Sequence, residues 1–256
     1  MFILVDLAVL KGMIIDSSKY RKRKLLSWKR IWEDLEIGYL DRDLLPLLVL
    51  MNRDAEIYTT SSCSGRIVVM DAEYPWVRDE TGVIFKSHIP IVSSELKFIY
   101  RYEPFKKIWI IVNGPIIHFY SLSARKAGKI LNTARRVGFK HSGVIHVSRD
   151  KGIFVELVTG IYLAQLIKTR ECEVVSIDDM ESLLTVLNNA LLEGKNRLQK
   201  LFLELKNNLP EKRDEEIEKD LMKIGAILEK SPLEILEEMM YSGINGGARK
   251  SIYTKH

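Results

Sequence analysis

The segment from Thr59 to Arg66 has the most unusual composition in the chain, because hydroxyl side chains surround Cys63 between two apolar stretches. A turn in this segment can present successive backbone N–H groups to an anion, and Gly65 permits a positive φ there. Arg66 can add a two-point grip on a carboxylate or phosphate. We therefore predict a ligand-binding loop formed by Ser61, Ser62, Cys63, Ser64, Gly65 and Arg66. The alternative is a polar hairpin turn whose hydroxyls bind only the local backbone.

Cys63 allows a different chemistry, because a thiol beside a histidine can act as a nucleophile. Candidate partners are His88, His118, His141 and His146. The local signatures of papain-like and caspase-like enzymes do not surround this cysteine. We expect a small, half-buried thiol that packs against a ligand. A cysteine-dependent hydrolase is kept as an alternative.

His88 and Glu103 are the candidate catalytic groups, because each closes a predicted strand. His88 suits a base or a hydrogen-bond donor to a cofactor, with a hydrogen-bonded core histidine as the plainer interpretation. Glu103 follows the apolar and aromatic stretch 96–102, and its carboxylate suits a ribose hydroxyl or an amine. Solvation is the usual fate of such an acid.

Several kinds of site and segment are missing from the sequence. No GxGxxG follows a strand and no Walker loop is present, so the nucleotide-binding route of a Rossmann fold is unsupported. The two cysteines, Cys63 and Cys172, form no CxxC pair, so we expect no metal site and a reducing compartment. No apolar run reaches the roughly 18 to 20 residues of a membrane span. We therefore expect a cytoplasmic protein without a membrane partner, in which the apolar opening 1–10 begins a buried strand or helix.

The charge balance favours an anionic partner such as nucleic acid, because the net charge is +5 and the sequence pI is about 9.0. Basic side chains concentrate in the stretch 19–30 and around the turn 135–141. We predict that these two places contact RNA phosphates through Lys19, Arg21, Lys22, Arg135, Arg136 and Lys140. An ordinary charged helix face is the alternative for each.

Apolar periodicity predicts the elements that must position these groups. A helix is expected over 17–36, with the basic residues facing outward and an inward face of Leu25, Leu26, Trp28, Ile31, Trp32 and Leu35. Further helices are expected over 44–52 and 123–137, and from 178 onward. Stretches rich in β-branched or aromatic residues predict strands over 56–60, 66–71, 83–88, 96–102, 107–112, 116–120, 143–149 and 153–158.

These elements predict an α+β fold with a mixed, mostly antiparallel sheet, packed helices and a helical C-terminal region. The expected domains are a mixed α/β catalytic domain at 1–177 and a helical region packed on it at 178–242. Residues 243–256 contain three glycines and no apolar period, so we expect a mobile tail there. The oligomeric state does not follow from the sequence.

The segment Thr59–Arg66 resembles the signature of the tRNA wybutosine-synthesizing protein 3 family. Other pieces of the chain resemble that family in the same order along the sequence. They are Asp16-Ser17-Ser18-Lys19, Trp76, His88, Tyr102-Glu103-Pro104-Phe105, the stretch Gly138 to Val144, Ser148-Arg149, and Asn196-Arg197. The likeness covers about residues 10 to 205, and the helices after residue 205 lie outside it.

The resemblance implies an S-adenosylmethionine-dependent methyltransferase with a mixed α/β fold unlike the Rossmann methyltransferases. The implied substrate is the tricyclic, wyosine-type guanosine 3′ to the anticodon of phenylalanine tRNA, methylated on a ring nitrogen. It further implies that Arg149 contacts RNA and that His88 and Glu103 serve the reaction. Trp76 and Tyr102 are candidates to hold the target base. A non-catalytic RNA-binding module, with the Ser-rich loop as a phosphate cradle, is the alternative.

Overall fold

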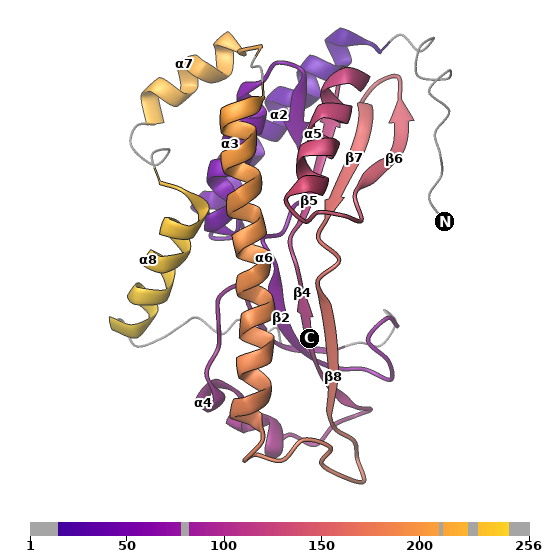
Figure 1. Cartoon of the computed structure of the whole chain (residues 1–256), viewed down its shortest axis with the longest axis vertical. Helices are drawn as coiled ribbons and strands as arrows, with labels where there is room; N and C mark the ends of the chain where they lie inside the picture. Colours follow the sequence, from indigo (N-terminus) through magenta and orange to yellow (C-terminus); the bar gives the residue numbers. More distant parts are fainter. Residues whose placement is uncertain (1–14, 78–81, 210–211, 225–229, 246–256) are drawn as a thin grey trace. The chain divides into compact units, whose positions relative to one another are not determined.

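The structure is a computed structural model that describes residues 15–77, 82–209, 212–224 and 230–245. The described chain divides into two compact units (Figure 1). Of the described residues, those within 15–64, 115–160 and 196–236 form the first unit, and those within 65–114, 161–195 and 237–245 form the second. The expected opening segment 1–10 lies outside the described residues.

The first unit contains an antiparallel four-stranded sheet in the order β1-β5-β7-β6. Its strands are β1 (Ile57–Thr59), β5 (Ile116–Ser121), β6 (Gly143–Ser148) and β7 (Gly152–Val158). Its helices are α2 (Ser17–Glu36), the 3-10 turn η1 (Arg42–Leu44), α3 (Leu45–Arg53), α5 (Ala124–Arg136) and α7 (Glu215–Ile224). The second part of α6 (Met180–Asn208) also belongs to this unit.

The second unit contains an antiparallel four-stranded sheet in the order β3-β2-β4-β8. Its strands are β2 (Arg66–Asp71), β3 (Gly82–Ser87), β4 (Ile108–Asn113) and β8 (Tyr162–Lys168). The short helix α4 (Ser93–Leu96), the 3-10 turn η2 (Lys97–Tyr100) and the first part of α6 complete it. The last helix, α8 (Pro232–Asn245), begins among residues of the first unit and ends among residues of the second.

These elements confirm the expected α+β class with antiparallel pairing and helices near the C-terminus, and they divide the strands between two sheets. The stretch 96–102 is a correction, because it forms the end of α4 and η2 instead of a strand. The Glu95 side chain accepts a hydrogen bond from the Val92 amide at 2.9 Å, which caps the start of this helical stretch. β8 was not expected, because its first three residues are exposed and give no buried alternation.

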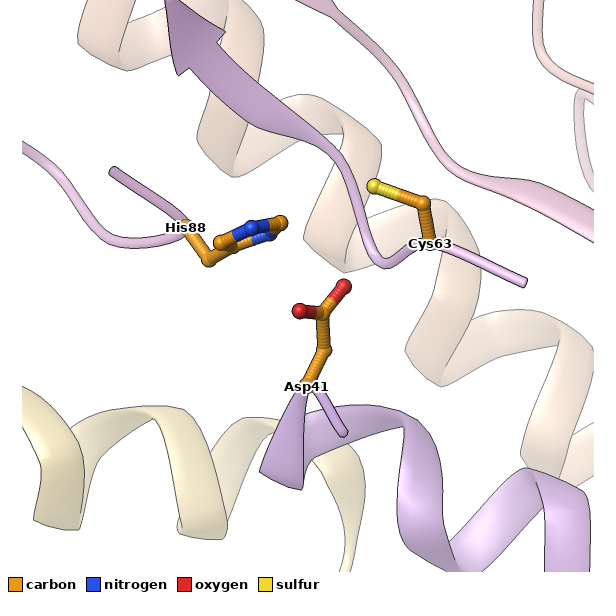
Figure 2. Close-up of side chains that lie close together, drawn as sticks. All are labelled: Asp41, Cys63 and His88. Atoms are coloured by element: carbon orange, nitrogen blue, oxygen red, sulfur yellow. The ribbon is translucent and has the colours of Figure 1, made fainter. Parts of the chain in front are cut away.

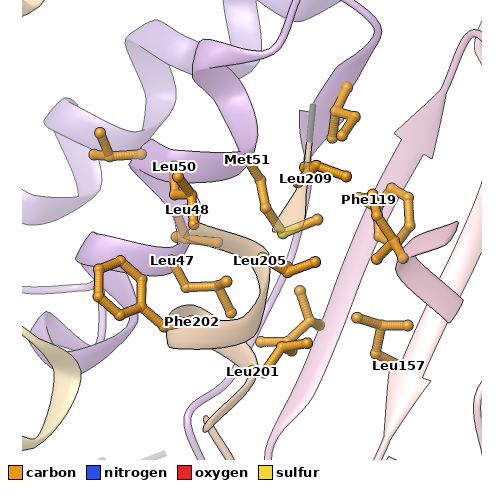
Figure 3. Close-up of a cluster of buried hydrophobic side chains, with 14 of the residues drawn as sticks. Leu47, Leu48, Leu50, Met51, Phe119, Leu157, Leu201, Phe202, Leu205 and Leu209 are labelled. Carbon is orange, nitrogen blue, oxygen red and sulfur yellow. The ribbon is translucent and has the colours of Figure 1, made fainter. Parts of the chain in front are cut away.

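A large apolar core lies between the sheet and the helices of the first unit (Figure 3). Phe119 of β5 and Leu157 of β7 point from the sheet toward Met51 of α3 and toward Leu201 and Leu205 of α6. These residues are buried to 2% exposure or less. Alternate residues of β5 and β7 therefore face this core, as the period of two along a strand requires.

α7 packs against this core and adds ion pairs to the first unit. Ile217 is fully buried in the cluster, and Leu221 packs beside it. Asp214, just before α7, pairs with Arg21. Glu218 accepts a hydrogen bond from Arg53 Nε at 2.6 Å. The segment is thus packed and paired within the first unit.

α2 matches the predicted helix, but one of its faces differs from the expectation. It begins where the Asp16 carboxylate accepts the amides of Ser18 and Lys19 at 3.1 and 3.0 Å, and it is followed by Gly38 with φ 73°. Leu26, expected inside, is 58% exposed, and Lys24, expected outside, is fully buried. Hydrophobic periodicity misplaces these two because a buried lysine with hydrogen-bond acceptors is not visible in an apolar pattern.

Lys24 joins α2 to the corner between α3 and β1. Its ammonium donates to the carbonyl oxygens of Asn52 at 2.5 Å, Asp54 at 2.9 Å and Ile57 at 2.5 Å. Three acceptors match the three N–H donors of a charged lysine. Burial works against that charge and lowers the pKa of Lys24 to about 7. The side chain therefore holds its position through hydrogen bonds instead of apolar contact.

The expected boundary between a domain at 1–177 and a helical region at 178–242 stays a prediction. α6 does start close to that point, at Met180. Of the expected tail 243–256, the first three residues continue α8, and the rest lies outside the described residues.

We expect Lys24→Met to lower the free energy of unfolding by about 2–4 kcal/mol, because three buried carbonyls lose a shared donor. Lys22→Met is the matched control, since Lys22 lies exposed on the same helix. The control should stay within about 0.5 kcal/mol of the wild-type chain. Urea denaturation followed by circular dichroism measures both. Equal stability of the two variants would show that the ammonium is dispensable.

Candidate functional site

The Ser-rich loop, residues 59–66, begins at a buried anchor in the first unit. The Asn52 side chain donates to Thr59 Oγ1 at 2.6 Å and accepts the Thr59 amide at 3.2 Å. Ser27 of α2 donates its hydroxyl to the Thr59 carbonyl. Asn52 and Thr59 are both buried. The hydroxyl of Thr59 is therefore structural, and the loop leaves β1 in a fixed direction.

The middle of the loop is held against the start of β5. Cys63 and Ile116 exchange two backbone hydrogen bonds of 2.9 Å. The Ser62 hydroxyl donates to the Thr60 carbonyl at 3.1 Å and accepts the His118 amide at 3.2 Å. Ser62 thus behaves as the alternative interpretation of the loop predicted, since its hydroxyl satisfies local backbone groups.

Ser61 remains at the surface of the loop. Its carbonyl accepts a hydrogen bond from His118 Nδ1 at 2.7 Å, and His118 Nε2 lies 2.7 Å from Glu156. Among the residues that the structure describes, nothing accepts the amide hydrogens of Ser61 and Ser62. Two consecutive N–H groups are therefore available to an anion, which is part of the predicted cradle.

The loop ends, within the first unit, on Asp41. The Asp41 carboxylate accepts the Ser64 amide at 2.8 Å, and Ser64 is fully buried. The Cys63 thiol lies within 4.8 Å of the same carboxylate. Both side chains are drawn in Figure 2. Within the first unit, the neighbour of the thiol is therefore the Asp41 carboxylate.

Gly65, Arg66 and His88 belong to the second unit, where they lie at one end of β2. His88, also drawn in Figure 2, follows β3 and places its Nδ1 3.1 Å from the Gly65 carbonyl. A carbonyl only accepts, so Nδ1 carries the proton, and Nε2 is the proton-accepting nitrogen of the neutral ring. The Arg66 side chain is exposed at the start of β2.

Glu103 lies at the other end of β2. The neighbouring Phe105 amide donates to Asp71 at 2.6 Å, and Asp71 is the last residue of the strand. Five residue steps separate Arg66 from Asp71, which is about 17 Å along an extended strand. The structure thus brings His88 to Gly65 but does not bring Glu103 there.

The residues predicted to contact RNA lie at two ends of the first unit's sheet. Lys19 pairs with Asp150 at 3.1 Å, and the Asp16 amide donates to the Arg149 carbonyl at 2.8 Å, so the start of α2 meets the β6–β7 turn. Lys22 and Arg149 are exposed there. Arg21 instead pairs with Asp214 and, at 2.8 Å, with Glu216, which compensates its charge.

The second basic group surrounds the end of α5. Arg135 donates to the Ser142 carbonyl at 2.9 Å, Arg136 to the Thr133 hydroxyl at 3.2 Å, and Lys140 is exposed. This group adjoins the start of β6, whereas Arg149 follows its end. The strand separates the two groups by about 17 Å. One nucleic acid can therefore contact the two basic groups only at two separate places along its backbone.

Three residues that shape the loop were missed or given another role by sequence reasoning. Asp41 and Asn52 were not singled out, and His118 was considered only as a partner for Cys63. Asp41 lies 23 positions from the amide that it binds. Asn52 is buried in a helix, where an amide side chain carries no distinctive pattern. No local spacing in the sequence could have paired these residues with the loop.

The part of the chain that the structure describes contains no helix with the length and apolar character needed to cross a membrane.

The family model described as "Methyltransferase TYW3" matches residues 20–207. A relative from Saccharolobus solfataricus is 41% identical over 173 residues, which are 67% of this chain and 82% of the relative. A relative from Aeropyrum pernix is 34% identical over 163 residues, which are 64% of this chain and 86% of the relative. Both relatives are named tRNA(Phe) 7-((3-amino-3-carboxypropyl)-4-demethylwyosine(37)-N(4))-methyltransferase.

Solved structures share the fold. One from Pyrococcus horikoshii has a TM-score of 0.69 and 25% identity, and it covers 74% of this chain and 97% of its own. One from Aeropyrum pernix has a TM-score of 0.59 and 31% identity, and it covers 65% of this chain and 97% of its own.

These matches define a methyltransferase, and the two antiparallel sheets set it apart from the Rossmann class. The chain belongs to the TYW3 methyltransferase family. The resemblance seen in the sequence and the expected enzyme class are therefore confirmed, and membership implies a methyl donor.

We expect Gly65→Ala to destabilise the protein by about 1–3 kcal/mol, because Gly65 has φ 97° and an added Cβ would lie 3.0 Å from the Asn113 carbonyl oxygen. Gly128→Ala is the matched control, since Gly128 lies inside α5 with no atom within 4 Å of the added Cβ. The control should be neutral or stabilising by up to about 1 kcal/mol. Thermal unfolding of the two variants should shift in opposite directions or differ clearly. Equal shifts would contradict this role of the backbone at Gly65.

Proposed function

We propose that this chain transfers a methyl group from S-adenosylmethionine to N4 of the wyosine-type guanosine at position 37 of phenylalanine tRNA. The observation that carries the proposal is the family match over residues 20–207, together with relatives of that name at 41% and 34% identity. The Ser-rich loop, which carried the resemblance, lies inside the matched region.

The loop offers groups that fit the amino-acid end of the methyl donor. The amides of Ser61 and Ser62, in the first unit, suit its carboxylate. Arg66, exposed in the second unit, is the charged group that the sequence motif proposes for an anionic end of the donor. Cys63 and Ser64 shape the loop instead, because their backbones bind Ile116 and Asp41. S-Adenosylmethionine, when bound, would supply the electrophilic methyl group.

His88 is the group that we propose for proton transfer. Its Nδ1 lies 3.1 Å from the Gly65 carbonyl, and a histidine ring can take the proton that the ring nitrogen of the substrate loses. Glu103 stands about 17 Å away along β2, and it is therefore not needed for this step. The substrate nitrogen itself attacks, so no nucleophile from the protein is required.

The exposed cations at the two ends of the first unit's sheet are the proposed contacts for the tRNA backbone. They are Lys19, Lys22, Arg135, Arg136, Lys140 and Arg149. Arg21 is left out of this set because it is half-buried and pairs with the buried Asp214, whereas the acids that pair with Lys19 lie in solvent. Contacts of this kind position a nucleic acid without reading its sequence.

The direct test is mass spectrometry of tRNA nucleosides after incubation with S-adenosylmethionine, with and without the protein. The unmethylated wyosine-type intermediate of phenylalanine tRNA should gain one methyl group only when the protein is present. Binding of that tRNA without any mass change, and without calorimetric binding of the donor, would instead favour the non-catalytic RNA-binding module.

We expect Cys63→Ser to keep most of the methyl-transfer rate, because the substrate nitrogen attacks directly. Arg66→Ala should weaken donor binding roughly ten- to hundredfold, since it removes a charge-assisted contact of about 1.5–3 kcal/mol. Lys86→Ala is the matched control, because Lys86 is an exposed cation on the neighbouring strand β3. Steady-state kinetics with varied donor separate the three variants. An inactive Cys63→Ser protein with intact fold and donor affinity would make the thiol a nucleophile.

We expect tRNA affinity to fall steeply with salt, and the paired change Arg135→Ala with Arg136→Ala to reduce the slope by about 1.4–1.8, since each neutralised phosphate contributes about 0.7–0.9. The change Lys219→Ala with Lys223→Ala on α7 removes the same charge elsewhere and should leave the slope nearly unaltered. Filter binding at several salt concentrations gives both slopes. A common slope for both double variants would remove the end of α5 from the RNA surface.

A further inference from the structure

The connection after β2 in the second unit carries a preformed pair of aromatic rings in solvent. The rings of Tyr74 and Trp76 are stacked, with centroids 5.0 Å apart and planes inclined by 9°. The Val77 amide donates to the Tyr74 carbonyl at 3.1 Å, which closes a turn with Pro75 at its second position. Proline fixes φ at that position, so the turn holds the two rings in register before any ligand arrives.

The stack has an open side. Trp76 is 73% exposed, and Tyr74 covers at most one face of its indole. A pair that served only its own turn would gain little from so large an exposed ring, because exposed apolar area contributes no burial. The open indole face is therefore a surface for a further flat ring, to which offset stacking is favourable.

Cations and a third aromatic ring lie at the same end of the sheet. The Lys107 ammonium lies 4.9 Å from the centroid of the Tyr74 ring. The Ala72 amide donates to the Lys107 carbonyl at 3.0 Å, so the start of β4 adjoins the connection that bears the pair. Phe105, two residues earlier, is 77% exposed. Lysines interleaved with exposed aromatic rings are the composition of surfaces that bind single-stranded nucleic acid.

This end of the sheet is remote from the Ser-rich loop. Gly65 precedes the first residue of β2, whereas the aromatic pair follows Asp71, its last residue. The strand between them is about 17 Å long. Tyr102, whose hydroxyl lies 3.5 Å from Asp71, stands at the same remote end. Trp76 and Tyr102 therefore do not hold the base that reacts beside the loop.

The geometry points to a second nucleobase subsite: the Tyr74–Trp76 pair stacks an unpaired base of the RNA other than the methylated one. Lys107, which pairs with Glu73, holds the start of β4 against this pair of rings, and the stacked rings themselves carry the proposed contact with the base. The inference rests on the proposed function in one respect, that RNA is the substrate. Stacking tolerates any base, so this subsite adds affinity and positions the loop strand without reading its sequence.

The test uses the full chain and a fluorescein-labelled single-stranded octamer of adenylate, without any methyl donor. Fluorescence anisotropy should show Trp76→Ala binding this octamer roughly five- to hundredfold more weakly than the wild type, the range for one stacked base. Trp76→Phe keeps a flat ring and should recover most of the affinity. Tyr39→Ala is the matched control, since Tyr39 is an equally exposed aromatic residue of the first unit, at 75%, and should bind normally.

Intrinsic fluorescence provides a second readout that a purely structural role would not move. Trp76 is the exposed one among the four tryptophans, so a stacked base should quench the wild-type emission, and Trp76→Phe should abolish that quenching. Normal octamer binding by Trp76→Ala, or binding without quenching, would overturn the inference. Self-association lost in Trp76→Ala, with octamer affinity unaltered, would also overturn it in favour of a protein contact. Because no methyl transfer is measured, these outcomes are distinct from a failure of the proposed reaction.

Discussion

The first unit's part of the site depends on the hydrogen bonds that the Lys24 ammonium donates. It binds three carbonyls at the corner where α3 gives way to β1, and these include both Asn52, whose side chain fixes Thr59, and Ile57, which begins the strand. A charge inside a protein is tolerated only when its donors are all used, so the corner has one acceptable geometry. The position of the start of the Ser-rich loop follows from this corner, although the loop itself supplies no acceptor to Lys24.

Most of the hydrogen bonds of the Ser-rich loop hold the loop itself in place. Thr59 bonds to Asn52, Ser62 bonds to the backbone of His118, and Ser64 bonds to Asp41. What remains for a ligand on the first unit's part of the loop is small: the two consecutive amides of Ser61 and Ser62. A run of hydroxyl residues in a sequence thus indicates a rigid loop, because short hydroxyl side chains readily bind the nearby backbone. The number of hydroxyls does not give the number of ligand contacts.

Local patterns made the elements predictable, whereas the site depended on distant pairs. α2, β2 and the turn at Gly65 follow from an apolar period, a β-branched run and a glycine, which are all short-range signals. Positions such as Asp41 against Ser64 depend on how the chain folds back across 23 residues. Glu103 shows the same limit, because the stretch before it is helical and it lies near Asp71, at the end of β2 opposite Gly65. Lys24 was misplaced since a buried charge contradicts the pattern that locates a core.

α7 changes what counts as the minimal protein. The family match ends at residue 207, yet Leu209, Ile217 and Leu221 complete the first unit's core beyond it. Asp214 and Glu218 of the same segment hold Arg21 and Arg53. A chain trimmed to the matched region would expose apolar core side chains to water. It would also leave two guanidinium groups without their acidic partners. In this protein α7 is part of the first unit's core, and a boundary drawn at the end of the family match would cut through that unit.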